Sequence, residues 1–367
     1  MKEYKLKELF DLQMGKTPSR NNVDYWNDPV YKWISIGDLS KSGKYISETK
    51  EYLSEKAIIE SGISIIPENT VIMSFKLSIG KTAITSEPMY SNEAIMSFRD
   101  KHITELMPDY IYYLLLSKDW DVGTNKAVMG KTLNKATLSE IVVGIHDIAE
   151  QKIIVSTLDK LGTIIEERKI ELQKLDELIK ARFVEMFGEG LADDGKYPLI
   201  PISEIGKVVS GATPKTSIDE YWDGDNLWIT PAEISDDTFV VSDTVRKITD
   251  EGVKSCAVNL LPIGTVILSS RAPIGKVVIA GAPMYCNQGF KNIIPNGKID
   301  SVYLYELLAM ETEYLNSLGR GATFKEISKQ IVENIRIKVP PIKIQRDFSN
   351  FVKQVDKSKV VEISEAA

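Results

Sequence analysis

The sequence repeats itself at one long and nearly constant spacing. GKTP at residues 15–18 is matched by GATP at residues 211–214, and PENTVIMS at 67–74 is matched by PIGTVILS at 262–269. These two offsets are 211 − 15 = 196 and 262 − 67 = 195 residues. This period is far longer than the roughly 20 to 50 residues of stacked repeat proteins, so each copy is expected to be a whole domain with its own core. Further matches fall in the same register: YW at 25 and 221, IGK at 79 and 274, and PMY at 88 and 283.

Each copy has a mixed pattern of strands and helices. Short apolar runs at 71–73 and 266–268 follow a Pro-x-x-Thr turn, which is typical of buried strands. The residues after each IGK predict a following strand, and residues 110–116 and 303–310 predict one helix in each copy. We therefore predict an α+β fold, with two similar globular domains, a twisted irregular sheet in each, and a pseudo-two-fold internal repeat.

A long helix is predicted between the two copies. Residues 151–187 contain no proline, and their apolar residues follow alternating steps of four and three. This spacing places one apolar seam along a single helix that needs a partner helix. At 1.5 Å per residue the helix is on the order of 55 Å long, so we interpret it as a spacer rather than a core helix.

A matching but shorter helix is predicted to follow the second copy from Gln345. The two helices are expected to pair as an antiparallel coiled coil. The residues predicted at this interface are Ile154, Leu158, Leu161, Ile165, Leu172, Leu175, Ile179, Phe348, Val352 and Val355. The predicted boundaries are 1–147 for the first domain, 148–188 for the central helix, 189–342 for the second domain and 343–367 for the distal helix.

Composition limits the classes of protein to consider. With 367 residues, 43% hydrophobic and 26% charged, the chain can form two domains and a connector. There is no apolar run long enough to span a membrane and no signal-peptide pattern, so we expect a cytoplasmic protein without a membrane partner. Two cysteines and two histidines predict neither a disulfide framework nor a metal site. The net charge of −7 does not indicate a nucleic-acid binder, although phosphate binding needs only a local basic face.

The order of domain, long helix, similar domain and similar helix, with G-x-T-P and Tyr-Trp near the start of each domain, resembles the specificity subunit of type I restriction–modification systems. The resemblance covers nearly the whole chain. It implies that each globular half is a target recognition domain that reads one half of a bipartite, asymmetric site in double-stranded DNA. It also implies that the helices set the distance between the halves and dock two copies of a modification subunit. That partner carries S-adenosylmethionine and methylates adenine at N6, and motor/nuclease restriction subunits add cleavage.

No motif in the chain predicts catalysis of its own. The three Gly-Lys-Thr peptides, at residues 15, 80 and 130, lack the glycine five positions earlier that a phosphate-binding loop needs. The Asn-Pro-Pro-aromatic motif of adenine-N6 methyltransferases is also missing. We therefore predict a non-catalytic DNA-recognition subunit that binds no cofactor. The alternative is a silent or truncated variant, or a protein–protein scaffold, because the second helix is short and the net charge is negative. A hydrolase is the least favoured reading.

Candidate DNA contacts lie in loops that match between the two copies, where side chains can vary on a rigid scaffold. Arg and Lys bind phosphate or guanine, and Asn and Gln can read adenine. The candidates are Lys16, Arg20, Lys76, Lys81, Asn92, Lys131, Lys135, Lys215, Arg271, Lys276, Asn287, Gln288, Arg320 and Lys325. Four recurring tryptophans are instead predicted to pack in the cores: Trp26, Trp33, Trp222 and Trp228.

Overall fold

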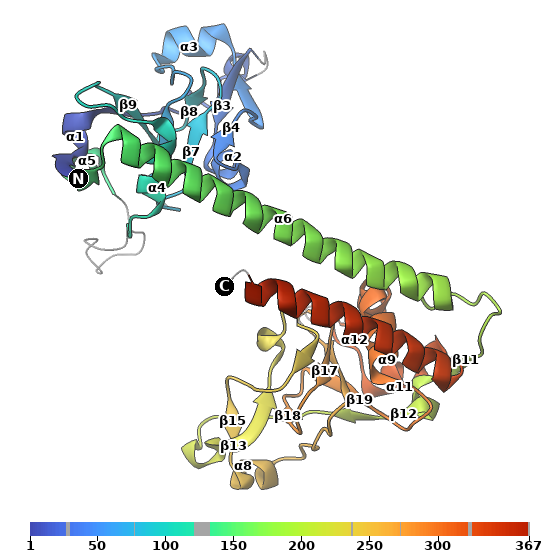
Figure 1. Ribbon diagram of the computed structural model, residues 1–367. Coiled ribbons are helices and arrows are strands. Elements are labelled where there is room, and N and C mark those ends of the chain that lie inside the picture. The colour runs from blue at the N-terminus through green and yellow to red at the C-terminus, as the bar shows by residue number, and fades with distance from the viewer. Residues whose placement is uncertain are drawn as a thin grey trace. The chain divides into compact units, whose positions relative to one another are not determined.

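The computed structural model describes residues 1–26, 30–76, 78–120, 133–235, 238–271, 273–321 and 325–365, the last nine of these without their side chains. The chain forms two compact units, unit 1 (Met1–Glu166) and unit 2 (Glu167–Ala367). The boundary between them lies inside the long helix α6 (Ile148–Phe187), which is labelled in Figure 1. The four-part division made from the sequence stays a prediction.

Unit 1 is built on a five-stranded sheet with the order β2-β9-β6-β7-β4. The β4–β7 pair is parallel and the other pairs in this sheet are antiparallel. A three-stranded sheet, β5-β3-β8, and the pair β1-β10 complete the unit. The strands are β1 (Lys2–Lys5), β2 (Phe10–Met14), β3 (Tyr31–Ile34), β4 (Tyr45–Ile46), β5 (Glu51–Leu53), β6 (Val71–Ser74), β7 (Thr82–Thr85), β8 (Tyr90–Ser91), β9 (Ile95–Asp100) and β10 (Val142–Ile145).

Unit 2 repeats this topology strand for strand. Its sheets have the orders β12-β19-β16-β17-β14 and β15-β13-β18, and β11 pairs with β20. The register repeats too, since Val71 lies opposite Phe98 in unit 1 and Val266 lies opposite Ile293 in unit 2. The predicted repeat and the α+β class are therefore confirmed. The strands are β11 (Leu199–Pro201), β12 (Gly206–Ser210), β13 (Trp222–Ile229), β14 (Val240–Val241), β15 (Lys247–Ile248), β16 (Val266–Ser270), β17 (Ile274–Ala280), β18 (Tyr285–Cys286), β19 (Phe290–Pro295) and β20 (Arg336–Lys338).

The helix predicted in each copy is present, and it packs on the large sheet of its unit. In unit 1 this is α4 (Pro108–Leu116), which begins with a proline whose fixed φ suits a first helical turn. In unit 2 it is α9 (Ser301–Met310), where the Asp300 carboxylate accepts from the first backbone amides. The short helices are α1 (Leu6–Leu9), α2 (Ile36–Lys41), α3 (Glu55–Ser61), α5 (Lys135–Ser139), α7 (Ile202–Ile205), α8 (Asp250–Ser255), α10 (Thr312–Ser317) and α11 (Lys329–Asn334), with 3-10 turns η1 (Val23–Tyr25), η2 (Asp219–Tyr221) and η3 (Pro231–Glu233).

The recurring tryptophans form one edge-to-face pair in each unit. Trp26 and Trp33 have ring centroids 5.1 Å apart, and Trp222 and Trp228 have centroids 5.0 Å apart. Each indole N–H donates to a backbone carbonyl of the nearby Thr-Pro turn. The prediction that these rings pack in the core rather than stack on bases is confirmed for the three that are buried, and Trp26 is half-buried against them.

The second half of α6 packs against α12 (Ile342–Glu365), and the two run antiparallel within unit 2 (Figure 1). Phe183 of α6 is fully buried between Tyr303 of α9 and Phe348 of α12. The predicted interface residues that lie in this core are Leu175, Ile179, Phe348, Val352 and Val355.

The first half of α6 belongs to unit 1. Ile154 packs against the unit 1 core, and Leu158 is half-buried. Leu161 and Ile165 are 49% and 57% exposed, and Leu172, just inside unit 2, is half-buried. The role of these positions in helix pairing or partner binding stays a prediction.

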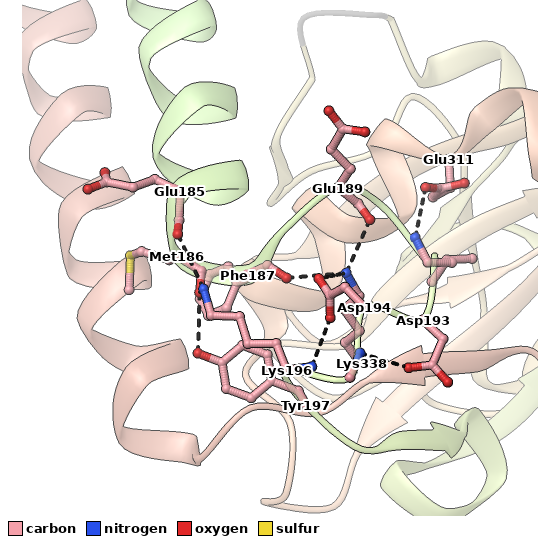
Figure 2. Close-up of polar contacts among 12 residues, drawn as sticks. Glu185, Met186, Phe187, Glu189, Asp193, Asp194, Lys196, Tyr197, Glu311 and Lys338 are labelled. Atoms are coloured by element: carbon pink, nitrogen blue, oxygen red, sulfur yellow. Dashed lines mark hydrogen bonds and ion pairs between the residues drawn. The ribbon is translucent and has the colours of Figure 1, made fainter.

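The C-terminal end of α6 is tied to unit 2 by polar groups (Figure 2). Lys338, 1% exposed, donates to the carbonyls of Phe187 and Glu189 and to Asp194 Oδ2, at 3.3, 3.2 and 2.8 Å. Lys196 donates to the Met186 carbonyl at 2.8 Å. The last carbonyls of a helix lack partners within the helix and carry partial negative charge, so ammonium groups stabilise this end.

No helix in the described part of the chain combines the length and the apolar character needed to cross a membrane.

Candidate nucleic-acid interface

Three loops of unit 1 meet at one edge of its five-stranded sheet. Neighbouring strands β2, β9, β6 and β7 are antiparallel, so the ends of β2 and β6 lie beside the starts of β9 and β7. Backbone hydrogen bonds join the loops: Lys16 N donates to Ser91 O at 2.8 Å, and Phe75 N donates to Ala94 O at 3.0 Å. We call residues 15–20, 75–76, 78–81 and 91–94 the unit 1 loop edge.

Unit 2 builds the same edge at the matching positions. Ala212 N donates to Cys286 O at 3.0 Å, and Ser270 N donates to Gly289 O at 2.7 Å. A further bond, from Ile327 N to Ser270 O at 2.9 Å, adds the segment after α10. The unit 2 loop edge therefore contains residues 211–216, 270–271, 273–276, 286–289, 320–321 and 325–327.

The close approach of these loops explains the glycine that opens each Thr-Pro turn. A Cβ atom on Gly15 would lie 2.2 Å from the Ser91 carbonyl oxygen, and one on Gly211 would lie 2.0 Å from the Asn287 carbonyl oxygen. Both distances are far below van der Waals contact, so a side chain there would push the two loops apart. The G-x-T-P motif thus holds the edge together.

Several candidate cations already have protein partners. Lys16 Nζ donates to Ser61 O at 2.5 Å, and Lys276 Nζ donates to Ile234 O at 2.7 Å. Arg20 forms an ion pair with Glu51, and its guanidinium carbon lies 3.8 Å from the Trp26 ring centroid.

The remaining candidates differ in exposure. Lys76 and Arg271 are half-buried at matching positions of the two edges. Lys131 lies outside the described residues. The exposed candidates are Lys81, Lys135, Lys215, Arg320 and Lys325. Of these, Lys135 begins α5 rather than lying on the loop edge. No observation assigns any of them to DNA, so their contacts stay predictions.

Asn92 and Asn287 support the turns in which they lie. Asn92 Oδ1 accepts from Ala94 N at 3.0 Å, and Asn287 Oδ1 accepts from Gly289 N at 2.8 Å. Such a turn holds the next residue outward, and this residue is Glu93 in unit 1 and Gln288 in unit 2, both exposed. A bond from the Thr17 hydroxyl lowers the pKa of Glu93, so this side chain is ionised near neutral pH.

Beneath the unit 2 edge lies a buried polar network. Lys291 is 6% exposed, and its Nζ lies 3.2 Å from Ser270 Oγ and 3.1 Å from Glu326 Oε1. The matching positions in unit 1 are Met96 and Phe75, which are both fully buried and apolar. A charged amine so deeply buried requires its carboxylate partner, so this network holds Glu326 and its loop in place.

A pocket of about 500 Å³ opens beside this network. It is lined by Thr230, Pro231, Ala232, Arg271, Asn287, Gly289 and Glu326. The edge thus presents hydrogen-bond donors, acceptors and a cation around a hollow, an arrangement suited to recognising a polar edge of a ligand.

The domain model of the type I restriction modification DNA specificity domain matches residues 1–174 and 196–365. This chain belongs to that family.

Relatives of known family agree with this assignment. Over 186 residues the chain is 39% identical to the type I restriction enzyme MjaIX specificity subunit of Methanocaldococcus jannaschii. The matched segment covers 49% of this chain and 43% of that protein. The putative MjaX specificity subunit of the same organism is 22% identical over 96% of this chain and 85% of its own length. The chain therefore spans less than half of the first relative.

Two solved structures share the fold along the whole chain. The S subunit of the type I restriction–modification system from M. genitalium has a TM-score of 0.57 at 15% identity and is covered over 91% of its length. A chain from work on complex assembly and conformational transition of the type I R-M system has a TM-score of 0.63 at 16% identity and is covered over 93%.

Sequence reasoning missed parts of the unit 2 loop edge. Lys291 and Glu326 were not singled out, because the counterpart of Lys291 in the first copy is the apolar Met96 and the pair therefore leaves no repeated signal. Arg246 was also missed. Its guanidinium carbon lies 3.7 Å from the Trp222 ring centroid, the place that Arg20 takes in unit 1, although the two arginines lie at unrelated sequence positions.

Proposed function

We propose that this chain is the sequence-specific DNA-binding subunit of a type I restriction–modification complex, and that unit 1 and unit 2 each read one half of a bipartite, asymmetric site in double-stranded DNA. One observation carries the proposal: the same loop edge is built twice on the same strand order, with different side chains at matching positions. Similar readers with different side chains suit a site whose two halves differ in sequence.

In such a complex this chain supplies the helical spacer, and its partner subunits supply the chemistry. α6 spaces the two readers, since its 40 residues span about 60 Å at 1.5 Å per residue. The internal repeat suits the docking of two copies of a modification subunit, as a two-fold dimer would. In this proposal those subunits carry S-adenosylmethionine and methylate adenine at N6, and motor/nuclease subunits add cleavage. This chain catalyses no step, binds no cofactor and acts in the cytoplasm.

A second candidate is a scaffold that binds modification subunits without productive DNA reading. Exposed apolar side chains along α6 favour it, because a protein partner can cover them without any DNA. Near the middle of the helix these exposed side chains are Leu161, Ile164, Ile165 and Ile170.

Modification-sensitive sequencing of cellular DNA separates the two candidates. The full chain is expressed with its cognate modification subunit, and the methylome is compared with that of cells lacking only this chain. The proposal expects one bipartite, asymmetric N6-methyladenine motif that disappears on deletion. An unchanged methylome, with the modification subunit shown to be active beside another specificity subunit, would contradict the DNA-reading function and favour the scaffold.

Salt dependence of DNA binding by the assembled complex gives an independent reading. A reader with several phosphate contacts loses roughly a thousandfold or more in affinity between low and moderate salt. A scaffold shows no specific DNA affinity to lose.

A further inference from the structure

The exposed residue that follows the asparagine turn of each loop edge, here called the tip residue, is Glu93 in unit 1 and Gln288 in unit 2. The two residues differ in having a carboxylate or an amide. Resting on the proposed function, we propose that Glu93 and Gln288 are equivalent base-reading residues, and that the exchange of a carboxylate for an amide makes the two half-sites differ. Glu93 accepts a hydrogen bond from the exocyclic amine of cytosine. Gln288 accepts from the exocyclic amine of adenine and donates to its N7.

The backbone places the two side chains identically. Besides the paired asparagine turns, Asn92 N donates to Ile34 O and Asn287 N donates to Ile229 O, both at 3.1 Å. Glu93 and Gln288 follow these asparagines directly, and both side chains are exposed. The two tips therefore differ in their side chains and not in their position on the scaffold.

A threonine holds each tip. The Thr17 hydroxyl donates to Glu93 Oε2, and the Thr213 hydroxyl donates to Gln288 Oε1. Both threonines belong to the G-x-T-P turns, which are bonded to the tip loops. A side chain held in one orientation loses less conformational entropy when it binds, which is what a base-reading group requires.

The threonine contact leaves different chemistry free to bind on each tip. In unit 1 it occupies one carboxylate oxygen, and the other oxygen can only accept. A carboxylate suits the N4 amine of cytosine in the major groove. In unit 2 the amide oxygen keeps a second lone pair and the amide nitrogen carries two donors, the pattern that reads N6 and N7 of adenine.

Charge and space around the tips fit these roles. The hydrogen bond from Thr17 lowers the pKa of Glu93 most, and Lys76 and Arg20 lower it further, so two cations lie near enough to offset repulsion between this carboxylate and phosphates. Beside Gln288 the 500 Å³ pocket, lined by Arg271 and Glu326, gives room for the edge of a base pair.

The test exchanges the two chemistries in the full chain, assembled with its modification subunit. Glu93→Gln and Gln288→Glu are each expressed, and the complete recognition motif is determined by modification-sensitive sequencing. We expect Glu93→Gln to change the preferred base at one position of one half-site by on the order of tenfold to a hundredfold, and to leave the other half-site unchanged. Gln288→Glu should do the same to the opposite half-site.

Glu68→Gln is the matched control, because Glu68 is exposed in the turn before β6, at the opposite edge of the same sheet. It should leave the motif unchanged. Methylation that continues with both half-sites unaltered in Glu93→Gln and Gln288→Glu overturns the base-reading assignment and leaves the proposed function standing. Absence of any methylated motif with the unaltered chain and an active partner overturns the proposed function itself.

Discussion

Unit 1 and unit 2 hold the same helix with different chemistry. In unit 1, Lys44 Nζ lies 2.6 Å from Asp109 Oδ1 and 2.5 Å from Asp159 Oδ1 on α6, and the Tyr113 hydroxyl donates to Asp159 at 2.6 Å. The backbone of unit 2 has Phe239 in the place of Lys44, since Ile84 N donates to Lys44 O and Ile279 N donates to Phe239 O, both at 2.9 Å.

At this position unit 2 has an aromatic contact with α9 in place of ion pairs. Phe239 packs edge to face on Tyr305, with centroids 4.7 Å apart. Deeper in the unit, Phe187 of α6 lies 4.7 Å from Tyr303 and 5.5 Å from Phe348 between ring centroids, and all three rings are fully buried. In unit 2 the helix has α12 beside it and can bury large rings, whereas in unit 1 the described helix face is more open. The repeat preserves backbone positions and leaves side-chain chemistry free to vary.

The largest effect is expected from Phe183→Ala, which opens a cavity between α6, α9 and α12. The ring is fully buried, so the free energy of unfolding of unit 2 should fall by about 3–5 kcal/mol. Chemical denaturation followed by hydrogen exchange in peptides of each unit measures the loss. Leu178→Ala on the same helix is the control: it is 47% exposed and should cost less than about 1 kcal/mol. Similar losses for both variants would show that the rings do not anchor the helix.

The two units also share one anchor, which gives the next largest effect. Gln151 accepts from Met107 N at 3.0 Å and donates to the carbonyls of Glu105 and His146, both at 2.9 Å. Gln345 makes the equivalent bonds with Asp300 N, Lys298 O and Pro340 O, at 2.8, 3.2 and 2.7 Å.

Gln151→Ala and Gln345→Ala should each cost about 1–3 kcal/mol, because buried backbone groups lose their partners. Hydrogen exchange at the start of α6 and of α12 measures the two losses separately. The exposed Gln173→Ala is the control and should be nearly neutral. Losses that differ between the two units by more than about 1 kcal/mol would break the equivalence of the anchors.

The sequence alone predicts the features that both copies share. The matching GKTP and GATP turns and the apolar runs at 71 and 266 predict the duplicated α+β fold, because a repeated core needs apolar residues in the same register. The seam of α6 predicts a partner helix, which unit 2 supplies through Phe348 and Val352. Contacts that only one copy makes leave no repeated signal. Examples are the Lys44 ion pairs, the Lys291 network, and Arg246 in the place of Arg20.

From the sequence, the loop edge of each unit was predictable only as a set of polar loops. Matching loops in the two copies made Lys16 and Lys276 candidate DNA contacts. The sequence could not show that each ammonium group already donates to a carbonyl of its own unit. Nor could it show that a threonine hydroxyl holds Glu93 and Gln288, since these bonds join residues far apart in the chain.

The smallest effect is the response of the Lys44 ion pairs in unit 1 to pH. Burial raises the pKa of Asp109, but hydrogen bonds from Lys44 and Tyr45 outweigh it and hold the pKa below its ordinary value. A carboxyl of this kind stabilises the fold above its unfolded pKa, about 4, and loses this contribution as pH falls through its folded pKa. Burial lowers the pKa of Lys44, but hydrogen bonds to Asp109 and Asp159 raise it above its ordinary value, so its contribution is lost only as pH rises above about 10.

Acid should therefore loosen the first half of α6. Between about pH 5 and pH 3, hydrogen-exchange protection of residues 152–166, corrected for intrinsic rates, should fall more in the unaltered chain than in Lys44→Met. Lys44→Met should cost about 1 kcal/mol or less at neutral pH, because the ion pairs are partly exposed and screened. The second half of α6 is not used as the reference, because a hydrogen bond from Lys338 at its end lowers the pKa of Asp194, which also makes that end sensitive to acid. Equal loss of protection in the unaltered chain and in Lys44→Met would mean that the Lys44 ion pairs do not stabilise the helix. Apolar contacts such as those of Ile154 would then hold it in unit 1, as aromatic rings do in unit 2.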